Sequence, residues 1–187
     1  MRNVEEIETK RLNLRGLRIS DARRVAQLCG DPAVARMILR APLPYLPVAA
    51  EGWIMTLAAR KPLGEDFVYA VERKASGELI GCIGAHKNGD ALEVGYWFGR
   101  PYWGAGYATE ALKAFIAEAK SLGRLEAGHF IDNPASGRVL EKSGFAYTGE
   151  IKPMFSLARG ESALCKRMTY VGAAADGDLE TGAAVAA

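Results

Sequence analysis

Two glycines stand just before the clearest helix pattern in the chain, in the segment Gly104-Ala105-Gly106-Tyr107-Ala108. Glycine lets a backbone approach a ligand closely, and the first amides of a helix have no partner within the helix. Together with the positive end of the helix dipole, such amides bind anions. The segment therefore predicts a phosphate or pyrophosphate site, although an ordinary tight strand-to-helix turn has the same residue types.

Two familiar phosphate motifs do not fit this segment. A P-loop requires Gly-Lys followed by Ser or Thr, which the segment lacks. The dinucleotide fingerprint Gly-x-Gly-x-x-Gly requires one more glycine than the segment has. The glycines therefore favour an anion-binding turn of another kind.

The elements around the turn have clear periodicities. From about 105 to 122, apolar residues recur at intervals of three and four while charged residues face away, which predicts an amphipathic helix. Before it, strand-like segments at 67–73, 78–86 and 91–99 are separated by short turns. This spacing predicts a three-stranded antiparallel meander that leads into the glycine turn.

The other segments alternate between strand and helix patterns, with a polar loop expected between the last two strands. Further helices are expected near 20–29, 31–39, 48–61 and 133–143, and further strands near 7–17, 124–131, 146–151 and 164–171. Strands precede, separate and follow the helices, so we expect one α/β (α+β) domain over 1–171 on a mixed sheet. The acidic, Ala- and Gly-rich stretch 172–187 predicts a mobile tail.

Composition narrows the function classes. The 187 residues are 49% hydrophobic and 25% charged, as in ordinary globular proteins, and the net charge of +2 provides no basic stripe for nucleic acid. No apolar run approaches the ~18 residues of a membrane span. Three scattered cysteines and two distant histidines predict neither a disulfide framework nor a metal site, so a reducing cytoplasm is the expected compartment.

Several short motifs occur in order and at fitting distances over about 7–170. They are Glu93-Val94-Gly95-Tyr96-Trp97, Pro101 to Ala111, Asp132-Asn133-Pro134-Ala135-Ser136 and Val139 to Phe145. Jointly they resemble the GNAT N-acetyltransferases. The similarity is greatest to the RimJ/RimL-like branch, which also resembles this chain at Glu8-Thr9-Lys10-Arg11-Leu12 and Ser20-Asp21-Ala22.

The resemblance implies a mixed, mostly antiparallel sheet that is splayed in the middle, with acetyl-CoA entering between strands 91–99 and 124–131. It implies that backbone amides of 104–108 bind the CoA pyrophosphate. Amides near Val94 and Tyr96 would contact the cofactor and supply the oxyanion donors.

Two positions depart from the family pattern. Pro101 replaces the usual Gln or Arg, and Ala105 replaces the frequent basic residue between the glycines. Amide contacts survive such changes because they do not use side chains. The missing charge would lower the affinity for CoA or be supplied by Arg100 or Lys142.

Asn133 and Ser136 are implied, by the same resemblance, as contacts to the CoA arm near its reacting end. Asn before Pro is also a typical helix N-cap, and Ser136 fits an exposed helix position. The two interpretations of Asn133 are compatible, because ligands also gather at helix starts.

Acetyl transfer to an amine requires a neutral amine, a donor to the developing oxyanion and a proton for the leaving thiolate. Glu93, on the strand that enters the turn, is the best candidate base, although a solvated carboxylate on a wet face is the alternative. Ser136 and Tyr147 are candidate proton donors to the thiolate, and Tyr147 fits a packed aromatic as well. His129 is expected to be a hydrogen-bonded core histidine.

The sequence thus predicts an acetyl-CoA-dependent N-acetyltransferase that works by direct transfer to a primary amine. The acceptor is a protein N-terminal α-amine or a small-molecule amine, and the residues do not choose between them. The alternative is a non-catalytic acyl-CoA-binding sensor or partner subunit. No metal, nucleic acid or membrane is expected as a partner, and the resemblance allows a homodimer.

Overall fold

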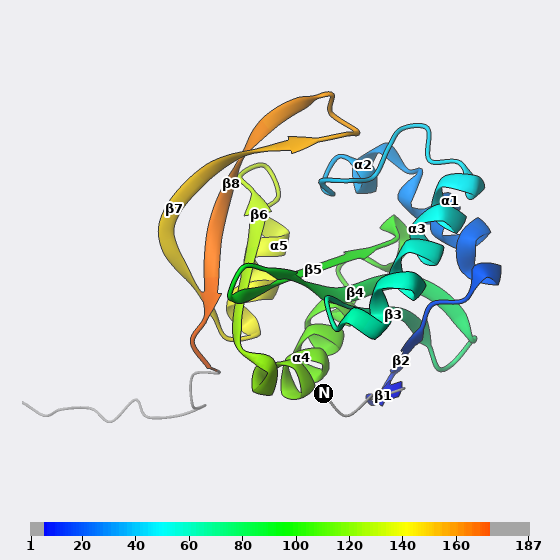
Figure 1. Ribbon diagram of the computed structural model, residues 1–187, viewed down its shortest axis with the longest axis horizontal. Coiled ribbons are helices and arrows are strands. Elements are labelled where there is room, and N and C mark those ends of the chain that lie inside the picture. Colours follow the sequence, from blue (N-terminus) through cyan, green and yellow to red (C-terminus); the bar gives the residue numbers. More distant parts are fainter. Residues whose placement is uncertain (1–5, 173–187) are drawn as a thin grey trace, which may run out of the picture.

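The computed structural model describes residues 6–172, which form one mixed sheet with helices on both faces (Figure 1). The expected tail at 172–187 lies outside these described residues except for Gly172, so its mobility stays a prediction.

The helices begin close to the expected positions, although the one expected over 31–39 already ends at Ala35. They are α1 (Ala22–Cys29), α2 (Pro32–Ala35), α3 (Pro47–Arg60), α4 (Tyr107–Ala119) and α5 (Pro134–Lys142). Four short 3-10 turns adjoin them, η1 (Ile19–Asp21), η2 (Lys61–Leu63), η3 (Arg100–Tyr102) and η4 (Lys120–Leu122). Proline at the start of α2, α3 and α5 explains three of the beginnings, because its fixed φ suits the first helical position and its missing N–H leaves no bond unmade.

The sheet has the order β1-β2-β3-β4-β5-β6-β8-β7. Its strands are β1 (Glu6–Glu8), β2 (Leu12–Gly16), β3 (Asp66–Arg73), β4 (Glu78–Asn88), β5 (Ala91–Phe98), β6 (Arg124–Phe130), β7 (Phe145–Ser156) and β8 (Glu161–Tyr170). Among these described strands, β5 and β6 are the parallel neighbours and the other pairs are antiparallel. The predicted mixed, mostly antiparallel sheet is confirmed.

The sheet opens between its two parallel strands. The register of β5 with β6 runs from Ala91 opposite Arg124 to Val94 opposite Ala127, and both strands continue beyond that point. We call this opening the splay; it is bounded by 95–98 of β5 and 128–130 of β6. The expected splay in the middle of the sheet is therefore present.

Two apolar clusters fix the layers on either side of the sheet. On one face α4 and α5 pack on a core that includes Leu14, Ile83 and the fully buried Phe115. On the other face α1 and α3 pack through Val25 and Ile54 in a cluster with Ala70 of β3 and Leu79 of β4. Alternation along the strands sends successive side chains to opposite layers, which is why both clusters draw on the same central strands.

Two strand predictions need correction. The single opening strand expected over 7–17 is a hairpin of β1 and β2, because the chain turns at Thr9, whose amide donates to the Leu12 carbonyl at 2.9 Å. The polar loop expected near 152–163 is instead the continuation of β7 and β8 into a long arm (Figure 1). Much of β7 is exposed on both faces, so it lacks the apolar alternation by which strands are recognised.

Candidate functional site

The glycine turn lies between η3 and α4, beyond the end of β5. Gly104 and Gly106 have φ values of 76° and 77°, in the left-handed region where a side chain would be strained. Gly106 is the N-cap of α4, so the amides that follow it have no acceptor within the helix. The turn is exposed, so its free amides are accessible, and their role as an anion site stays a prediction.

The Arg11 side chain, from the distant β1–β2 hairpin, contacts this turn. The Nη1 group of Arg11 donates to the Ala105 carbonyl at 2.9 Å, and the guanidinium lies 4.5 Å from the centroid of the Tyr107 ring. Its Nε donates to Glu110 of α4 at 2.6 Å. The first turn of α4 is therefore tied to the edge of the sheet by one arginine.

Glu110 accepts two further hydrogen bonds from the same hairpin. One comes from the Thr9 hydroxyl at 2.6 Å and the other from the Arg11 amide at 2.8 Å, both to Oε1. Partial burial alone would raise the pKa of Glu110, but the hydrogen bonds from Thr9 and Arg11 outweigh it and the pKa is lowered. The carboxylate thus stays charged and paired.

Tyr96 and Ser136 connect the two sides of the splay. The Tyr96 hydroxyl donates to the Ser136 carbonyl at 3.0 Å and lies 2.9 Å from Ser136 Oγ, which then donates in return. Burial raises the pKa of Tyr96, so the phenol keeps its proton near neutral pH. Asn133 accepts a hydrogen bond from the Ser136 amide at 3.2 Å and caps α5, as expected.

Glu93 points to the face of the sheet opposite α4 and is paired with Arg167 of β8. Both oxygens accept from the guanidinium, at 2.7 Å from Nη1 and 2.5 Å from Nη2. These bonds raise the pKa of Arg167 and outweigh burial, which alone would lower it, so the buried guanidinium stays charged. A second carboxylate, that of Glu126, lies 3.6 Å from Arg167, so one cation faces two anions at this place.

His129 and Tyr147 form a separate pair on the face that carries α5. The Nδ1 of His129 donates to the Phe130 carbonyl at 2.8 Å, which leaves Nε2 to accept from the Tyr147 hydroxyl at 3.1 Å. His129 is buried with both ring nitrogens partnered, as the sequence predicts for a core histidine. Gly137 fits beside this pair because a Cβ there would lie within 2.7 Å of either partner.

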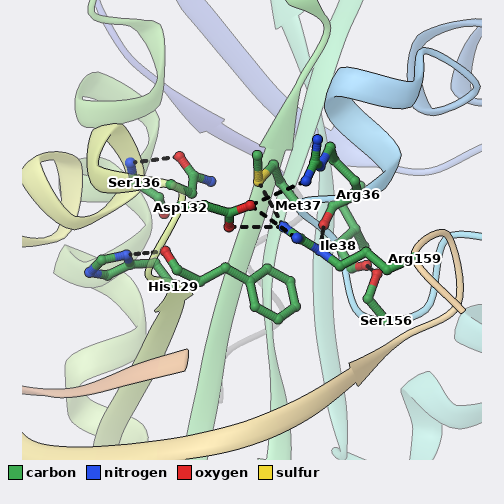
Figure 2. Close-up of polar contacts among 10 residues, drawn as sticks. Arg36, Met37, Ile38, His129, Asp132, Ser136, Ser156 and Arg159 are labelled. Atoms are coloured by element: carbon green, nitrogen blue, oxygen red, sulfur yellow. Dashed lines mark hydrogen bonds and ion pairs between the residues drawn. The ribbon is translucent and has the colours of Figure 1, made fainter. Parts of the chain in front are cut away.

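On the other side of the splay, the tip of the β7–β8 arm is held by an ionic bridge (Figure 2). Arg159 donates to both oxygens of Asp132, at 3.0 and 2.9 Å, and to the Arg36 carbonyl at 2.7 Å. The Arg36 side chain adds a contact to Asp132 at 3.3 Å, and the Arg159 guanidinium lies 4.6 Å from the Phe130 ring centroid. Hydrogen bonds from Arg159 lower the pKa of Asp132.

Backbone contacts extend this bridge. The Ser156 hydroxyl donates to the Ile38 carbonyl at 3.1 Å, and the Leu157 amide donates to the Leu39 carbonyl at 3.0 Å. The arm therefore meets the segment after α2 on the far side of β6 (Figures 1 and 2). We call the contact between the arm tip, Asp132 and 36–39 the arm bridge.

A hollow of about 1000 Å³ lies elsewhere, at the opposite end of β5. Its lining includes Leu57 of α3, Phe67 of β3 and Leu92 of β5. Because the splay lies where β5 ends and this hollow lies where β5 begins, the two are different places on the sheet.

A family model described as an acetyltransferase (GNAT) domain matches residues 11–146. The chain belongs to the GNAT acetyltransferase family. It is 30% identical over 152 residues to the uncharacterized N-acetyltransferase YoaA of Bacillus subtilis. The aligned region covers 78% of this chain and 85% of YoaA. The predicted acyltransferase class is thereby confirmed.

Two solved GNAT structures have a similar fold. One is RimL, a ribosomal L7/L12 alpha-N-protein acetyltransferase in complex with coenzyme A, with a TM-score of 0.77 at 20% identity over 88% of this chain and 97% of that one. The other is the microcin C7 self-immunity acetyltransferase MccE in complex with acetyl-CoA and AMP, with a TM-score of 0.76 at 16% identity over 87% and 93%.

In this GNAT protein the predicted coenzyme residues gather around the splay. The turn 104–108 begins α4, Val94 is the last residue of β5 paired with β6, Tyr96 follows in the opening, and Asn133 with Ser136 begins α5. The candidate catalytic residues do not form one cluster but belong to three separate hydrogen-bonded pairs. Ser136 is joined to Tyr96, whereas Tyr147 is joined to His129 and Glu93 to Arg167.

Three arginines of the site were missed by the sequence analysis as functional residues. Arg11 lies in a motif that resembles the family, which was a signal, but its contact with Ala105 spans 94 positions. Arg167 and Arg159 meet partners 74 and 27 positions away and belong to strands and turns without a distinctive pattern. Their roles follow from the way β8 and its turn lie in the sheet.

The described residues 6–172 hold no group of three His, Cys, Asp or Glu side chains placed to bind a metal ion. In the same range, no helix has the length and apolar character needed to cross a bilayer. The cysteines, Cys29, Cys82 and Cys165, are buried and not disulfide-bonded.

Proposed function

We propose that this GNAT protein transfers an acetyl group from acetyl-CoA directly to a primary amine, with an α-amine as the preferred acceptor. The observation that carries the proposal is the splay beside a helix start with two left-handed glycines. The α4 amides bind the diphosphate, and the pantetheine arm follows the opened edge of β5 toward Ser136. Backbone amides near Val94 and Tyr96 donate to the carbonyl oxygen as it becomes an oxyanion.

In the proposed step the amine nitrogen attacks the thioester carbonyl, a C–N bond forms and the C–S bond breaks. The Ser136 hydroxyl turns from Tyr96 to donate a hydrogen bond to the leaving thiolate, and the Tyr96 hydroxyl, which keeps its proton, can then donate to Ser136 Oγ, 2.9 Å away. CoA leaves as the thiolate, and the amine proton is lost separately. Tyr147 is the less favoured donor because its hydroxyl already donates a hydrogen bond to His129 Nε2.

Glu93 receives the amine proton, directly or through a water. Both of its oxygens already accept hydrogen bonds from Arg167, so the proton must be taken by a lone pair that these bonds leave free. Deprotonating a lysine-like amine of pKa ~10.4 costs about 4.6 kcal/mol at pH 7, whereas deprotonating an α-amine of pKa ~7.8 costs about 1. The lower cost is the reason why we propose an α-amine as the preferred acceptor.

The acceptor is either a protein N-terminus or a small molecule with an α-amine. The name of RimL, an alpha-N-protein acetyltransferase with a similar fold, supports the first. The name of MccE, a microcin self-immunity acetyltransferase with a similar fold, supports the second. The two classes differ in size. We place the acceptor on the side of the splay that carries the arm bridge, which is therefore where the two classes would be distinguished.

A thiol-release assay tests the proposal. Acetyl-CoA is offered with peptides that have a free N-terminus, with matched peptides whose only amine is a lysine side chain, and with free amino acids and polyamines. We expect thiol release with α-amines and much less with lysine-only peptides. Binding of CoA without thiol release from any amine would favour a sensor or partner subunit, and absence of binding would refute the proposal.

A further inference from the structure

The β1–β2 hairpin lies at the far edge of the sheet from the splay, yet it reaches the coenzyme turn. Arg11, in the turn between β1 and β2, is the residue that makes this contact. Its guanidinium holds the Ala105 carbonyl, the Glu110 carboxylate and the face of the Tyr107 ring at once. These three partners are the residue between the two glycines and two residues of the first turn of α4.

The bond to Ala105 has a directional consequence. In a planar trans peptide the carbonyl of one residue and the amide of the next point in opposite directions. Since Arg11 holds the Ala105 carbonyl on its own side, the Gly106 amide is turned to the opposite side, away from the hairpin. That amide is the first of those expected to meet the diphosphate, so Arg11 fixes its orientation.

The bonds to Glu110 have an electrostatic consequence. A carboxylate in the first turn of α4 interacts favourably with the helix dipole, but it would repel a diphosphate bound at the same end. This carboxylate accepts three hydrogen bonds from the hairpin, from the Thr9 hydroxyl and from the backbone amide and Nε of Arg11. The guanidinium also neutralises its charge. The hairpin thus leaves the positive end of α4 available to an anion.

We propose that Arg11 is a positioning residue for the coenzyme diphosphate: it orients the turn and neutralises Glu110, so that the turn can bind an anion without basic side chains at Pro101 and Ala105. This inference rests on the proposed function, because it concerns the same coenzyme site. The sequence alone suggests Arg100 or Lys142 as the residue that compensates for Pro101 and Ala105. The structure favours Arg11 because its guanidinium touches the turn itself, whereas Lys142 lies at the opposite end of α5 from Ser136.

Two acetyl donors separate this role from general damage to the fold. Acetyl-CoA contains the diphosphate, and S-acetylpantetheine has the same thioester and arm without it. With Arg11→Met we expect the KM for acetyl-CoA to rise about tenfold, because Glu110 loses the cation that balances it and the Gly106 amide loses its fixed orientation. We expect kcat with acetyl-CoA, and kcat/KM with S-acetylpantetheine, to change less than about twofold.

Two variants sharpen the test. Arg11→Lys keeps the charge but cannot hold both Ala105 and Glu110, so an intermediate KM is expected. Lys74→Met is the matched control, because it breaks the exposed ion pair of Lys74 with Glu8 of the same hairpin and leaves the turn untouched. Its KM values for both donors should equal those of the wild type.

An unchanged KM for acetyl-CoA in both Arg11 variants, or an equal loss with both donors, would overturn the inference. Inactivity of the wild type with every donor and amine would instead refute the proposed function. Calorimetry then still tests the inference, because titrations with CoA and with pantetheine need no turnover. Arg11→Lys should weaken binding of CoA and not that of pantetheine, and equal weakening of both would contradict the role of Arg11.

Discussion

The two sides of the splay are held by different kinds of interaction. On the coenzyme side, two glycines and the start of α4 form a site from one short segment, mostly through backbone groups. On the acceptor side, the bridge joins Arg36, Asp132 and Arg159, which come from three distant segments, through side chains. Backbone geometry is fixed by few residues, whereas side-chain bridges can change with single substitutions. The acceptor side is therefore where we expect specificity to be set.

The largest effect should come from the backbone of the coenzyme side. Gly106→Val forces a β-branched residue to φ near 77° and places a side chain beside the anion-binding amides. Strain of about 1–2 kcal/mol and lost hydrogen bonds to a charged group should together raise the KM for acetyl-CoA by about 100-fold. Steady-state kinetics with acetyl-CoA as the varied substrate measures this.

Gly77→Ala is the control for Gly106→Val. Gly77 has φ 66° with nothing within 4 Å of a new Cβ, so the substitution adds left-handed strain far from the coenzyme. It should lower the free energy of unfolding by about 1 kcal/mol and leave the KM unchanged. If the KM rose equally in both variants, strain alone would explain the effect and the turn would lose its special role.

Glu93→Gln should give the next largest effect, on rate and not on coenzyme binding. Loss of the proposed proton acceptor should lower kcat by about 10- to 100-fold and flatten the dependence of kcat/KM on alkaline pH. A full profile from pH 6 to 10, at saturating acetyl-CoA, measures both. Glu126→Gln is the control, because it removes the other carboxylate near Arg167 and keeps the bidentate pair.

A Glu93→Gln enzyme with the pH profile of the wild type would remove Glu93 as the base. The remaining role of the carboxylate would then be to hold Arg167 in place. In that case Glu93→Gln should lower the thermal midpoint while kcat stays near that of the wild type, because a nearly buried cation loses its main partner.

Arg159→Met should affect the acceptor side only. Without its bonds to Asp132 and Arg36, the arm tip is released, and we expect the KM for the amine to rise about fivefold with the KM for acetyl-CoA unchanged. Lys152→Met, which breaks the exposed pair of Lys152 with Glu150 on the same arm, is the matched control. A rise in the KM for acetyl-CoA instead would show that the two sides are not separate.

The smallest effect concerns acid pH. Because hydrogen bonds from Arg159 lower the pKa of Asp132 in the folded state, the bridge stabilises the fold above the unfolded pKa and loses this contribution as the pH falls through the folded value. Thermal midpoints measured from pH 6 to below pH ~4 should fall less steeply in Asp132→Asn than in the wild type. Identical slopes would mean that the bridge adds nothing to stability.

The sequence predicts the coenzyme side well because its signals are local. The period of α4, the glycines before it and the Asn133-Pro134 start of α5 are properties of neighbouring residues, and all three appear in the structure. The splay could be expected from the family resemblance, since nothing in Ala91–Phe98 itself shows where pairing with β6 ends.

The acceptor side is less predictable because distant contacts define it. Much of β7 is exposed on both faces, and apolar side chains of the arm such as Phe155 and Leu164 are themselves exposed, so β7 beyond Ile151 lacks the apolar alternation of a half-buried strand. Arg159 and Arg167 are ordinary surface-type residues in the sequence and become buried partners only when the arm curves over the sheet. Such pairings depend on strand order, which short-range patterns do not encode.

The central claim is that the amides from Gly106 to Ala108 bind the coenzyme diphosphate. The most direct measurement is the change in backbone amide chemical shifts of isotope-labelled protein when CoA, or pantetheine as the control, is added. We predict that CoA shifts the amide signals of Gly106, Tyr107 and Ala108, and that pantetheine leaves them unchanged. Unchanged amide signals at the turn on addition of CoA, with chemical-shift changes instead around the hollow near Phe67 and Leu92, would contradict the account.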